Sequence, residues 1–261
     1  MSSFDLLSAA VAAAERAASY LRSARRPDGP AGWTVKDQRD FVTEVDRTSE
    51  RLITEVLHAA TPAGRVVGEE LNPVLVRDGL VWIVDPLDGT TNFLHDIPAW
   101  AVSIAAAVDG VLQAAVVFDV PHGERYEAAR GGGAHLAGRP LRVSPIVAPE
   151  FALIGTGFPF KNIARLDEYQ RHFAAIAQAT SGIRRPGAAA IDLAWVAAGR
   201  FDGFWELNLA PWDLAAGALL VREAGGIVTD LDGDEDILRH TSIVAGNPAM
   251  HAWLRSVTRP A

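Results

Sequence analysis

The chain has 261 residues, a formal net charge of −8 at pH 7 and no cysteine. With Lys36 and Lys161 as its only lysines and no basic stripe, it is a poor candidate for nucleic-acid binding, which needs cations against the phosphate backbone. The absence of cysteine excludes disulfides, thiolate nucleophiles and zinc sites built on thiolates. A hydrophobic share of 49% fits an ordinary globular protein of one large domain or two small ones.

The N-terminal segment predicts an amphipathic helix. Its apolar residues recur at spacings of three and four, in Phe4, Leu7, Val11, Ala14, Ala18 and Leu21. Ser2 or Ser3 is the expected N-cap. Asp5 and Glu15 interrupt the apolar stretch and no basic leader precedes it, which argues against a signal peptide. Because no apolar run approaches the length of a membrane span, we expect a cytoplasmic protein without membrane contact.

Helices and then strands fill the first half of the chain. Two prolines and two glycines within 26–33 end the first helix, and a second helical pattern runs to about His58. Apolar runs predict strands at 65–70 and 80–84 and a pair of strands within 100–120. One further strand and a glycine-rich turn are expected within 125–143. Asp109-Gly110 joins the strand pair and suits a type I′ turn, which needs positive φ at both central residues. The first sheet should therefore be at least partly antiparallel.

Strands and helices alternate in the second half. The expected strands are 151–158, 182–185, 203–206, 226–229 and 242–245. The expected helices are 163–179, 189–198, 212–224 and 248–257, the last with proline at its start. This change of pattern predicts an α/β (α+β) protein with two sub-domains, 1–148 and 149–261, in one compact unit.

Carboxylates stand at the ends of several apolar elements. The apolar run 80–84 leads directly into Asp85-Pro86-Leu87-Asp88, and Asp46, Glu69-Glu70 and Asp213 occupy similar places elsewhere. Buried carboxylates are costly without partners, and Mg²⁺ prefers oxygen ligands together with substrate phosphate. Pro86 stiffens the turn, so that both aspartates can face one pair of ions. Two neighbouring ions can stabilise the attacking and leaving oxygens of an in-line displacement.

The residues after Asp88 suit a phosphate. Gly89 allows the backbone to approach a ligand closely. Gly89, Thr90 and Thr91 could offer free N–H groups at the start of a helical turn. An isolated Asp-x-x-Asp would indicate no more than a surface loop, and Asp213 could simply cap the next helix. The complete pattern of apolar strand, paired aspartates, glycine and two threonines is a more specific indication of a metal and phosphate site.

The segment "IVTDLDGDED" (227–236) is better explained as a solvated acidic hairpin turn. An apolar strand followed by Asp-x-Asp-Gly is similar to the nucleophile motif of haloacid-dehalogenase-type phosphatases, but the short remaining tail has no lysine. An EF-hand is excluded because Gly233 stands at the fourth loop position and Thr241, at the twelfth, cannot chelate.

Taken together, the motifs resemble those of the inositol monophosphatase family. "WIVDPLDGTTNFLHDIP" and "PWDLAAGALLVREAGG" look like its two signatures, and "DFVTEVD", "GEE", "GTGFPF" and "GRFDGFWE" match in the family's order. The resemblance runs from about Lys36 to the final strand. It implies an alternating αβαβα layered sandwich with mixed sheets and an antiparallel N-terminal sheet. It also implies a lithium-sensitive, Mg²⁺-dependent phosphatase, usually a homodimer, with a small phosphate ester as substrate.

The resemblance also assigns roles to individual residues. Two or three Mg²⁺ ions would be held by Glu69, Asp85, the Leu87 carbonyl, Asp88 and Asp213. Asp46 would pair with Thr90 to orient and deprotonate the attacking water, and Glu69 would share this catalytic role. Substrate contacts would come from Asp88, Gly89, Thr90, Ala189, Glu206 and Asp213, with the Gly89 and Thr90 N–H groups on the phosphate and Glu206 on the inositol hydroxyls.

Several assignments stay open at this point. Lys36 could approach the phosphate or be a solvated loop lysine, Glu70 could support the metal ligands, and His95 is better explained as a structural histidine. Ala188 replaces a Ser or Thr often found in the family, so one hydroxyl contact to substrate is missing. Inositol 1-phosphate is the expected substrate. The alternatives are fructose 1,6-bisphosphate, histidinol phosphate, adenosine 3′,5′-bisphosphate, or a regulatory role like that of family members that bind RNA polymerase or nucleic acid.

Overall fold

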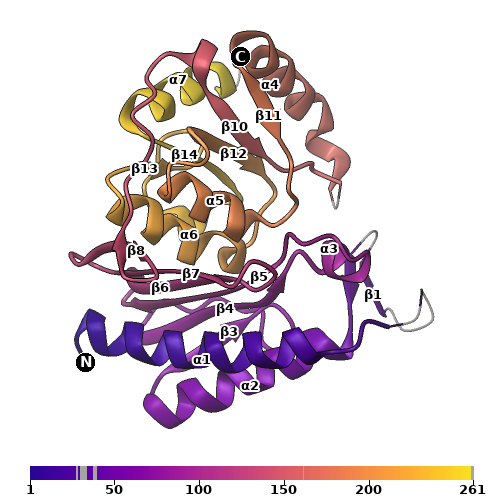
Figure 1. Ribbon diagram of the computed structural model, residues 1–261, viewed down its shortest axis with the longest axis vertical. Helices are drawn as coiled ribbons and strands as arrows, with labels where there is room; N and C mark the ends of the chain where they lie inside the picture. Colours follow the sequence, from indigo (N-terminus) through magenta and orange to yellow (C-terminus); the bar gives the residue numbers. More distant parts are fainter. Residues whose placement is uncertain (28, 30–33, 38–39, 161, 260–261) are drawn as a thin grey trace.

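A computed structural model describes residues 1–27, 29, 34–37, 40–160 and 162–259 of the chain. Its elements stack in five layers, helices alternating with sheets, and the expected αβαβα sandwich is confirmed (Figure 1). No helix in these ranges is long and apolar enough to cross a membrane.

The α-helices are α1 (Ser3–Ser23), α2 (Glu44–Ala60), α3 (Thr90–Leu94), α4 (Leu166–Ala179), α5 (Ala189–Ala197), α6 (Pro211–Glu223) and α7 (Pro248–Thr258). The strands of the first half are β1 (Thr34–Asp37), β2 (Asp40–Val42), β3 (Arg65–Gly68), β4 (Leu80–Asp88), β5 (Ala101–Val108), β6 (Val111–Asp119), β7 (Glu124–Ala129), β8 (Gly133–Leu136) and β9 (Arg139–Pro140). Those of the second half are β10 (Leu153–Thr156), β11 (Gly182–Arg184), β12 (Gly203–Leu207), β13 (Ile227–Thr229) and β14 (Ser242–Gly246). Short 3₁₀ helices span Pro149–Phe151, Ile163–Arg165 and Ile237–Arg239.

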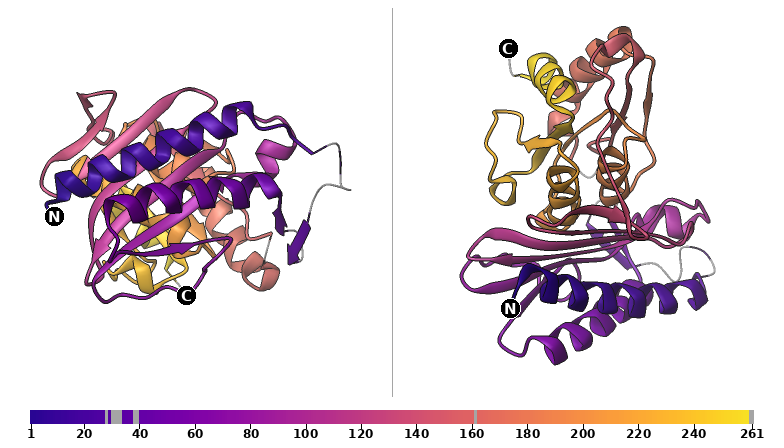
Figure 2. Two further views of the ribbon diagram at one scale, coloured as in Figure 1. Left: turned by 90° about the horizontal axis from the view of Figure 1, so that it is seen from below. Right: turned by 60° about the vertical axis from the view of Figure 1, so that its left-hand side comes forward.

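Helices α1 and α2 form the first layer and lie side by side across one face of the large sheet (Figure 2). Ser2 is the N-cap of α1, as expected. The prediction that Phe4 lies on the buried face is wrong, because its side chain is exposed. The buried face is instead built largely from small residues such as Ala10, Ala13 and Ala17, which let the helix approach its neighbours closely.

The large sheet has seven strands in the order β3-β4-β5-β6-β7-β8-β9. Strand β3 is parallel to β4, and every later pair is antiparallel. The turn between β5 and β6 has the expected positive φ at both Asp109 and Gly110. The expectation that the first sheet is at least partly antiparallel is thus confirmed, with β3–β4 as its parallel pair.

Strand β4 is longer than the sequence indicated. It was expected to end at Val84, but it continues to Asp88, and the register with β5 shifts between Asp85 and Asp88. The pairing with β3 ends where Gly68 lies opposite Val84. Beyond that point β4 has a strand partner on one side only, so the missing N–H of Pro86 breaks no ladder with β3. The register shift is a bulge that turns both aspartates toward the site.

Helices α5 and α6 lie between the two sheets and bury one continuous apolar core (Figure 2). The second sheet has the order β11-β10-β12-β14-β13 and mixes parallel with antiparallel pairs. Helices α4 and α7 cover its other face. Because the middle helices contact both sheets, we propose that the halves 1–148 and 149–261 form one compact unit.

Candidate metal and phosphate site

A cavity of about 580 Å³ opens between the two halves of the chain. Its lining includes the end of β4, the turn into α3, the start of α5 and the start of α6. Together with Glu69 after β3 and Glu206 on β12, these elements bring nearly all the predicted site residues to the lining, namely Glu69, Asp85, Leu87, Asp88, Gly89, Thr90, Ala189, Glu206 and Asp213. Asp46 lies behind this wall and reaches it through Thr90.

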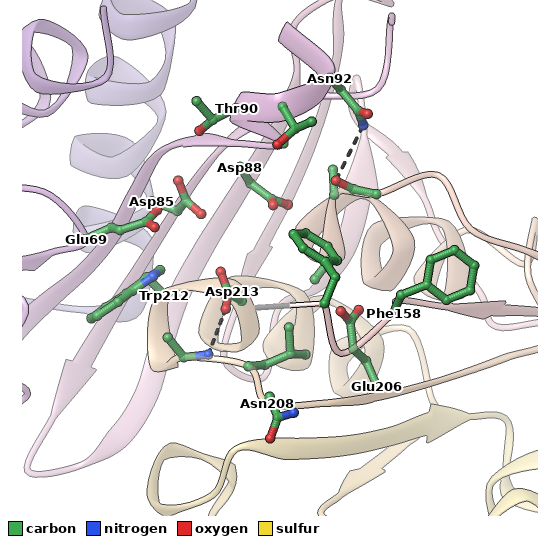
Figure 3. Close-up of a pocket in the computed structure, with 18 of the residues that line it drawn as sticks. Glu69, Asp85, Asp88, Thr90, Asn92, Phe158, Glu206, Asn208, Trp212 and Asp213 are labelled. Carbon is green, nitrogen blue, oxygen red and sulfur yellow. Dashed lines mark hydrogen bonds between the residues drawn. The ribbon is translucent and has the colours of Figure 1, made fainter. Parts of the chain in front are cut away.

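Three aspartates form the centre of this wall. One carboxylate oxygen each from Asp85, Asp88 and Asp213 lie within 4.8 Å of one another. Figure 3 shows these carboxyl groups and that of Glu69 gathered around one space. Because Asp213 comes from the other half of the chain, this cluster exists only when the two halves are packed together.

Backbone groups hold each aspartate in place. Asp85 Oδ1 accepts a hydrogen bond from the Leu87 N–H at 3.0 Å, within the bulge of β4. Asp88 Oδ2 accepts from the Ala190 N–H at 2.7 Å and so caps α5, where Ala188 at the N-cap has no hydroxyl to do so. Asp213 Oδ2 accepts from the Ala210 N–H at 2.7 Å at the start of α6.

The concentration of carboxylates in this wall favours the binding of a cation. Burial raises the pKa of the Asp85 carboxyl well above its usual range, and the neighbouring carboxylates of Glu69, Asp88 and Asp213 raise it further. Among the described lining residues, five are acidic and only Arg185 is a strong base. The donor set is all oxygen, and the Leu87 carbonyl adjoins it, so the residues present fit a hard divalent cation.

Asp46 and Thr90 form a hydrogen-bonded pair beside the cluster. The Thr90 hydroxyl lies 2.9 Å from Asp46 Oδ1 and 3.0 Å from the Leu87 carbonyl oxygen. On its other oxygen, Asp46 accepts from the Thr43 N–H at 2.9 Å and the Thr43 hydroxyl at 2.6 Å. Burial raises the pKa of Asp46, while the hydrogen bonds from Thr43 and Thr90 partly oppose this rise.

The turn after β4 packs closely against the chain at Ala99. Gly89 has φ of 88°, in the left-handed region, and a Cβ there would lie 2.7 Å from the Ala99 carbonyl oxygen. It is the N-cap of α3, so the N–H groups that follow have no partner within the helix. Asn92, which sequence reasoning did not single out, donates to Ala99 O at 2.7 Å and Pro186 O at 2.9 Å. It thereby ties this turn to the loop before α5.

The far part of the cavity contains Glu206 on β12 (Figure 3). A Cβ at Gly157 would overlap the Glu206 carboxyl group, which explains a glycine in "GTGFPF". Arg185 also escaped the sequence analysis. Its guanidinium carbon lies 5.2 Å from the Phe158 ring centre and 5.3 Å from that of Phe160.

Other residues singled out in the sequence lie outside the cavity lining. The backbone N–H of Glu70 donates a hydrogen bond to Glu50 Oε2. His95 is exposed at the end of α3. The Lys36 side chain lies outside the described residues. The acidic segment 227–236 does form a turn, but Asp230 is buried rather than solvated. Its Oδ1 accepts the N–H groups of residues 233 and 234, which compensate for the lost water.

Asp192 on α5 is a buried carboxyl next to the cavity, and it was not anticipated. Neither of its oxygen atoms has a hydrogen-bond partner among the described residues. Burial raises its pKa well above the usual range. The charges of Glu206 and Asp88 raise this pKa further, and Arg185 opposes them. The folded state therefore disfavours ionised Asp192.

We expect Asp192→Asn to stabilise the protein at neutral pH by about 1 to 3 kcal/mol. A carboxyl with a raised pKa in the folded state contributes most below its unfolded pKa of about 3.9 and loses that contribution as pH rises through the folded pKa. The gain of the variant should therefore be largest at pH 8 and shrink toward pH 4. Urea unfolding of both proteins across this range is the measurement, and a gain independent of pH would contradict it.

The fold and the site together define a layered α/β protein with a carboxylate-lined cavity suited to divalent cations. The family model described as the inositol monophosphatase family matches residues 4–260. The chain belongs to this family, and the resemblance found in its motifs is confirmed.

Individual relatives carry two kinds of name. A Pseudomonas aeruginosa protein named Nus factor SuhB is 49% identical over 231 residues, covering 86% of this chain and 85% of that protein. An inositol-1-monophosphatase from Rhizobium meliloti is 48% identical over 225 residues, covering 86% and 85%. The crystal structure of extragenic suppressor protein SuhB from Bartonella henselae aligns with a TM-score of 0.90 at 41% identity, covering 97% of this chain and 98% of that one.

Proposed function

We propose that this protein is a Mg²⁺-dependent phosphomonoesterase that hydrolyses inositol 1-phosphate. The observation that carries the proposal is the cluster of three aspartates, with oxygens within 4.8 Å of one another, next to the Thr90–Asp46 pair. Glu69, Asp85, the Leu87 carbonyl, Asp88 and Asp213 would hold two or three Mg²⁺ ions. When bound, these ions would offset the charge of the phosphate and lower the pKa of the attacking water.

In this proposal Thr90 and Asp46 orient the water. The Thr90 hydroxyl has one proton, and the Asp46 carboxylate is a stronger acceptor than the Leu87 carbonyl. With that proton donated to Asp46, the Thr90 oxygen can accept a hydrogen bond from a water in the cavity. The water proton then moves toward this pair as the new P–O bond forms and the ester P–O bond breaks, and the leaving alcohol oxygen takes up a proton from solvent in the open cavity. The N–H groups of Gly89 and Thr90 would bind the phosphate oxygens.

Substrate choice is assigned to Glu206 and to the backbone of Ala189, both on the cavity wall. We expect Glu206→Gln to lower kcat/KM for inositol 1-phosphate about 10- to 100-fold, mainly through KM, because a carboxylate hydrogen bond to a hydroxyl is lost. Phosphate release should be measured with and without Mg²⁺. The panel is inositol 1-phosphate, fructose 1,6-bisphosphate, histidinol phosphate and adenosine 3′,5′-bisphosphate.

Glu127→Gln is the matched control, since Glu127 is a half-buried glutamate on a strand away from the cavity. It should leave all four activities unchanged. Mg²⁺-dependent turnover of another ester in preference to inositol 1-phosphate would keep the metal centre and replace the substrate.

The main alternative is a regulatory binding role, because a relative named Nus factor SuhB is as similar as one named inositol-1-monophosphatase. The intact acidic cluster argues against a protein that has lost its catalytic centre. Loss of turnover with retained partner binding in Asp85→Asn would separate the roles. We further propose, from the family resemblance, a cytoplasmic, lithium-sensitive homodimer, which lithium inhibition and sedimentation would test.

A further inference from the structure

Helix α2 presents three buried polar side chains to the site. Asp46, Ser49 and Glu50 stand at spacings of three and four, on one face of the helix. The same face continues into the apolar core through Ile53 and Leu57. Asp46 contacts Thr90, as described above, whereas Ser49 and Glu50 hydrogen-bond to backbone groups of the segments that carry Glu69, Asp85 and Asp88.

Glu50 holds the turn that follows β3. Its carboxylate accepts the Glu70 N–H on Oε2 at 2.8 Å and the Leu71 N–H on Oε1 at 3.1 Å. The side chain is only 1% exposed, and a Cβ at Gly68 would overlap its carboxyl group. Glu50 therefore fits closely against the residues on both sides of Glu69.

Ser49 holds the bulge of β4. Its hydroxyl donates to the Pro86 carbonyl at 2.9 Å, between Asp85 and Asp88 where the strand register shifts. Glu69 is joined to the same strand through its N–H, which donates to the Val84 carbonyl at 3.2 Å. One helix turn thus fixes both segments that carry the acidic groups of the first half.

We propose that Glu50 and Ser49 are positioning residues of the metal centre, with Glu50 presenting Glu69 and Ser49 setting the placement of Asp85 relative to Asp88. The proposal rests on the metal-dependent function proposed above. Burying the Glu50 carboxylate is unfavourable unless hydrogen bonds compensate for the lost water. The two backbone N–H groups can do so only if the turn keeps one conformation. Such precision matters at a cation site, where small displacements of ligands weaken binding.

The test uses Glu50→Gln in the full-length protein, with Mn²⁺ as the probe. Glutamine keeps the size of the side chain but places an N–H group against one of the two backbone donors. We expect calorimetric titration of the folded protein to show Mn²⁺ binding weakened about 10- to 100-fold. The Mg²⁺ concentration for half-maximal phosphatase activity should rise by a similar factor, while kcat at saturating Mg²⁺ stays within a few-fold of wild type.

Ser49→Ala is the second variant and removes one hydroxyl. It should weaken Mn²⁺ binding about 2- to 10-fold, and it keeps the proposal testable if Glu50→Gln does not fold. Glu55→Gln, an exposed glutamate on α2, is the control and should change neither quantity.

Each outcome has a distinct meaning. A lower melting temperature with unchanged Mn²⁺ affinity in both variants would reduce Glu50 and Ser49 to structural anchors and overturn the proposal, leaving the proposed function intact. Wild-type protein that binds no Mn²⁺ would overturn the metal centre itself, and the positioning role with it.

Discussion

Asp85→Asn is expected to lower phosphatase activity by at least about 10³-fold and, in the same protein, to raise the stability of the metal-free fold. The loss follows from the place of Asp85 at the centre of the acidic cluster, where charge stabilisation by cations is worth several kcal/mol. The gain follows because burial and three neighbouring carboxylates raise the pKa of Asp85, so its ionised form is disfavoured without a cation.

The stability effect has a defined sign with pH and with Mg²⁺. A raised pKa means that the contribution of Asp85 is present at low pH and lost as pH rises through the folded value. In EDTA at pH 7.5 the asparagine variant should therefore be more stable than wild type by about 1 to 3 kcal/mol. Adding Mg²⁺ should stabilise wild type, because ligand binding to the native state does so by mass action, and should stabilise the variant much less.

Thermal unfolding in EDTA and in Mg²⁺, alongside phosphate release, is the measurement. Asp119→Asn is a suitable control, since Asp119 is also a buried aspartate of the large sheet with a pKa raised by burial, but it pairs with His122 away from the cavity. It should keep both activity and the response to Mg²⁺. Full activity in Asp85→Asn would remove the cluster from the mechanism.

Much of the fold could be predicted from the sequence because local signals are strong here. The N-cap at Ser2, the Asp109-Gly110 turn and the proline at the start of α7 each act within a few residues, and the structure has all three. The prediction that Phe4 lies on the buried face of α1 was wrong because alanine-rich segments give a weak hydrophobic pattern. Which alanines are buried depends on the neighbours of the helix rather than on its own sequence.

The length of β4 could not be read from the sequence for a similar reason. Asp-Pro-x-Asp is typical of a turn, and proline normally ends a paired strand. Whether Pro86 breaks a ladder depends on where β3 stops, which is a property of the sheet. The bulge between Asp85 and Asp88 is therefore a tertiary feature, even though both aspartates were identified correctly as neighbours.

The site shows that two explanations of one residue need not exclude each other. Asp213 is not the N-cap of α6, which is Ala210, but it does stabilise the start of this helix by accepting the Ala210 N–H. The same carboxylate also belongs to the acidic cluster. Asp88 similarly caps α5. Both carboxylates thus join a helix start to the acidic cluster. Through the Asp88–Ala190 bond, the packing of the two halves is coupled to the geometry of the cluster.

Residues that support the site were the hardest to anticipate. Each of three supporting residues, Ser49, Glu50 and Asn92, hydrogen-bonds to a backbone group 20 or more residues away in the sequence. Asn92 also makes one short-range bond, to Ala99. No motif spacing indicates such distant partners. The same holds for Arg185, whose environment is set by two phenylalanine rings. Motif patterns identify candidate ligand-binding groups, whereas the groups that hold them in place are defined by the packed fold.

The second large effect is expected at Thr90. Thr90→Val should lower kcat about 10²- to 10⁴-fold while leaving Mn²⁺ affinity within a few-fold of wild type, because it removes the hydroxyl that links the water to Asp46 but none of the proposed metal ligands. Thr90→Ser retains the hydroxyl and should recover most of the activity. Thr48→Val on α2, away from the cavity, is the control.

The pH profile distinguishes a proton-accepting role of the pair from a purely steric one. Burial raises the pKa of Asp46, so its ionised fraction, and with it kcat, should grow with pH over a range above that of an ordinary aspartate. In Thr90→Val this acidic limb should flatten, since Asp46 no longer contacts the water through the hydroxyl. If Thr90→Val instead loses activity equally at every pH and Thr90→Ser fails to restore it, the methyl packing of Thr90 matters more than its hydroxyl, and Asp46 serves chiefly to cap α2 through Thr43.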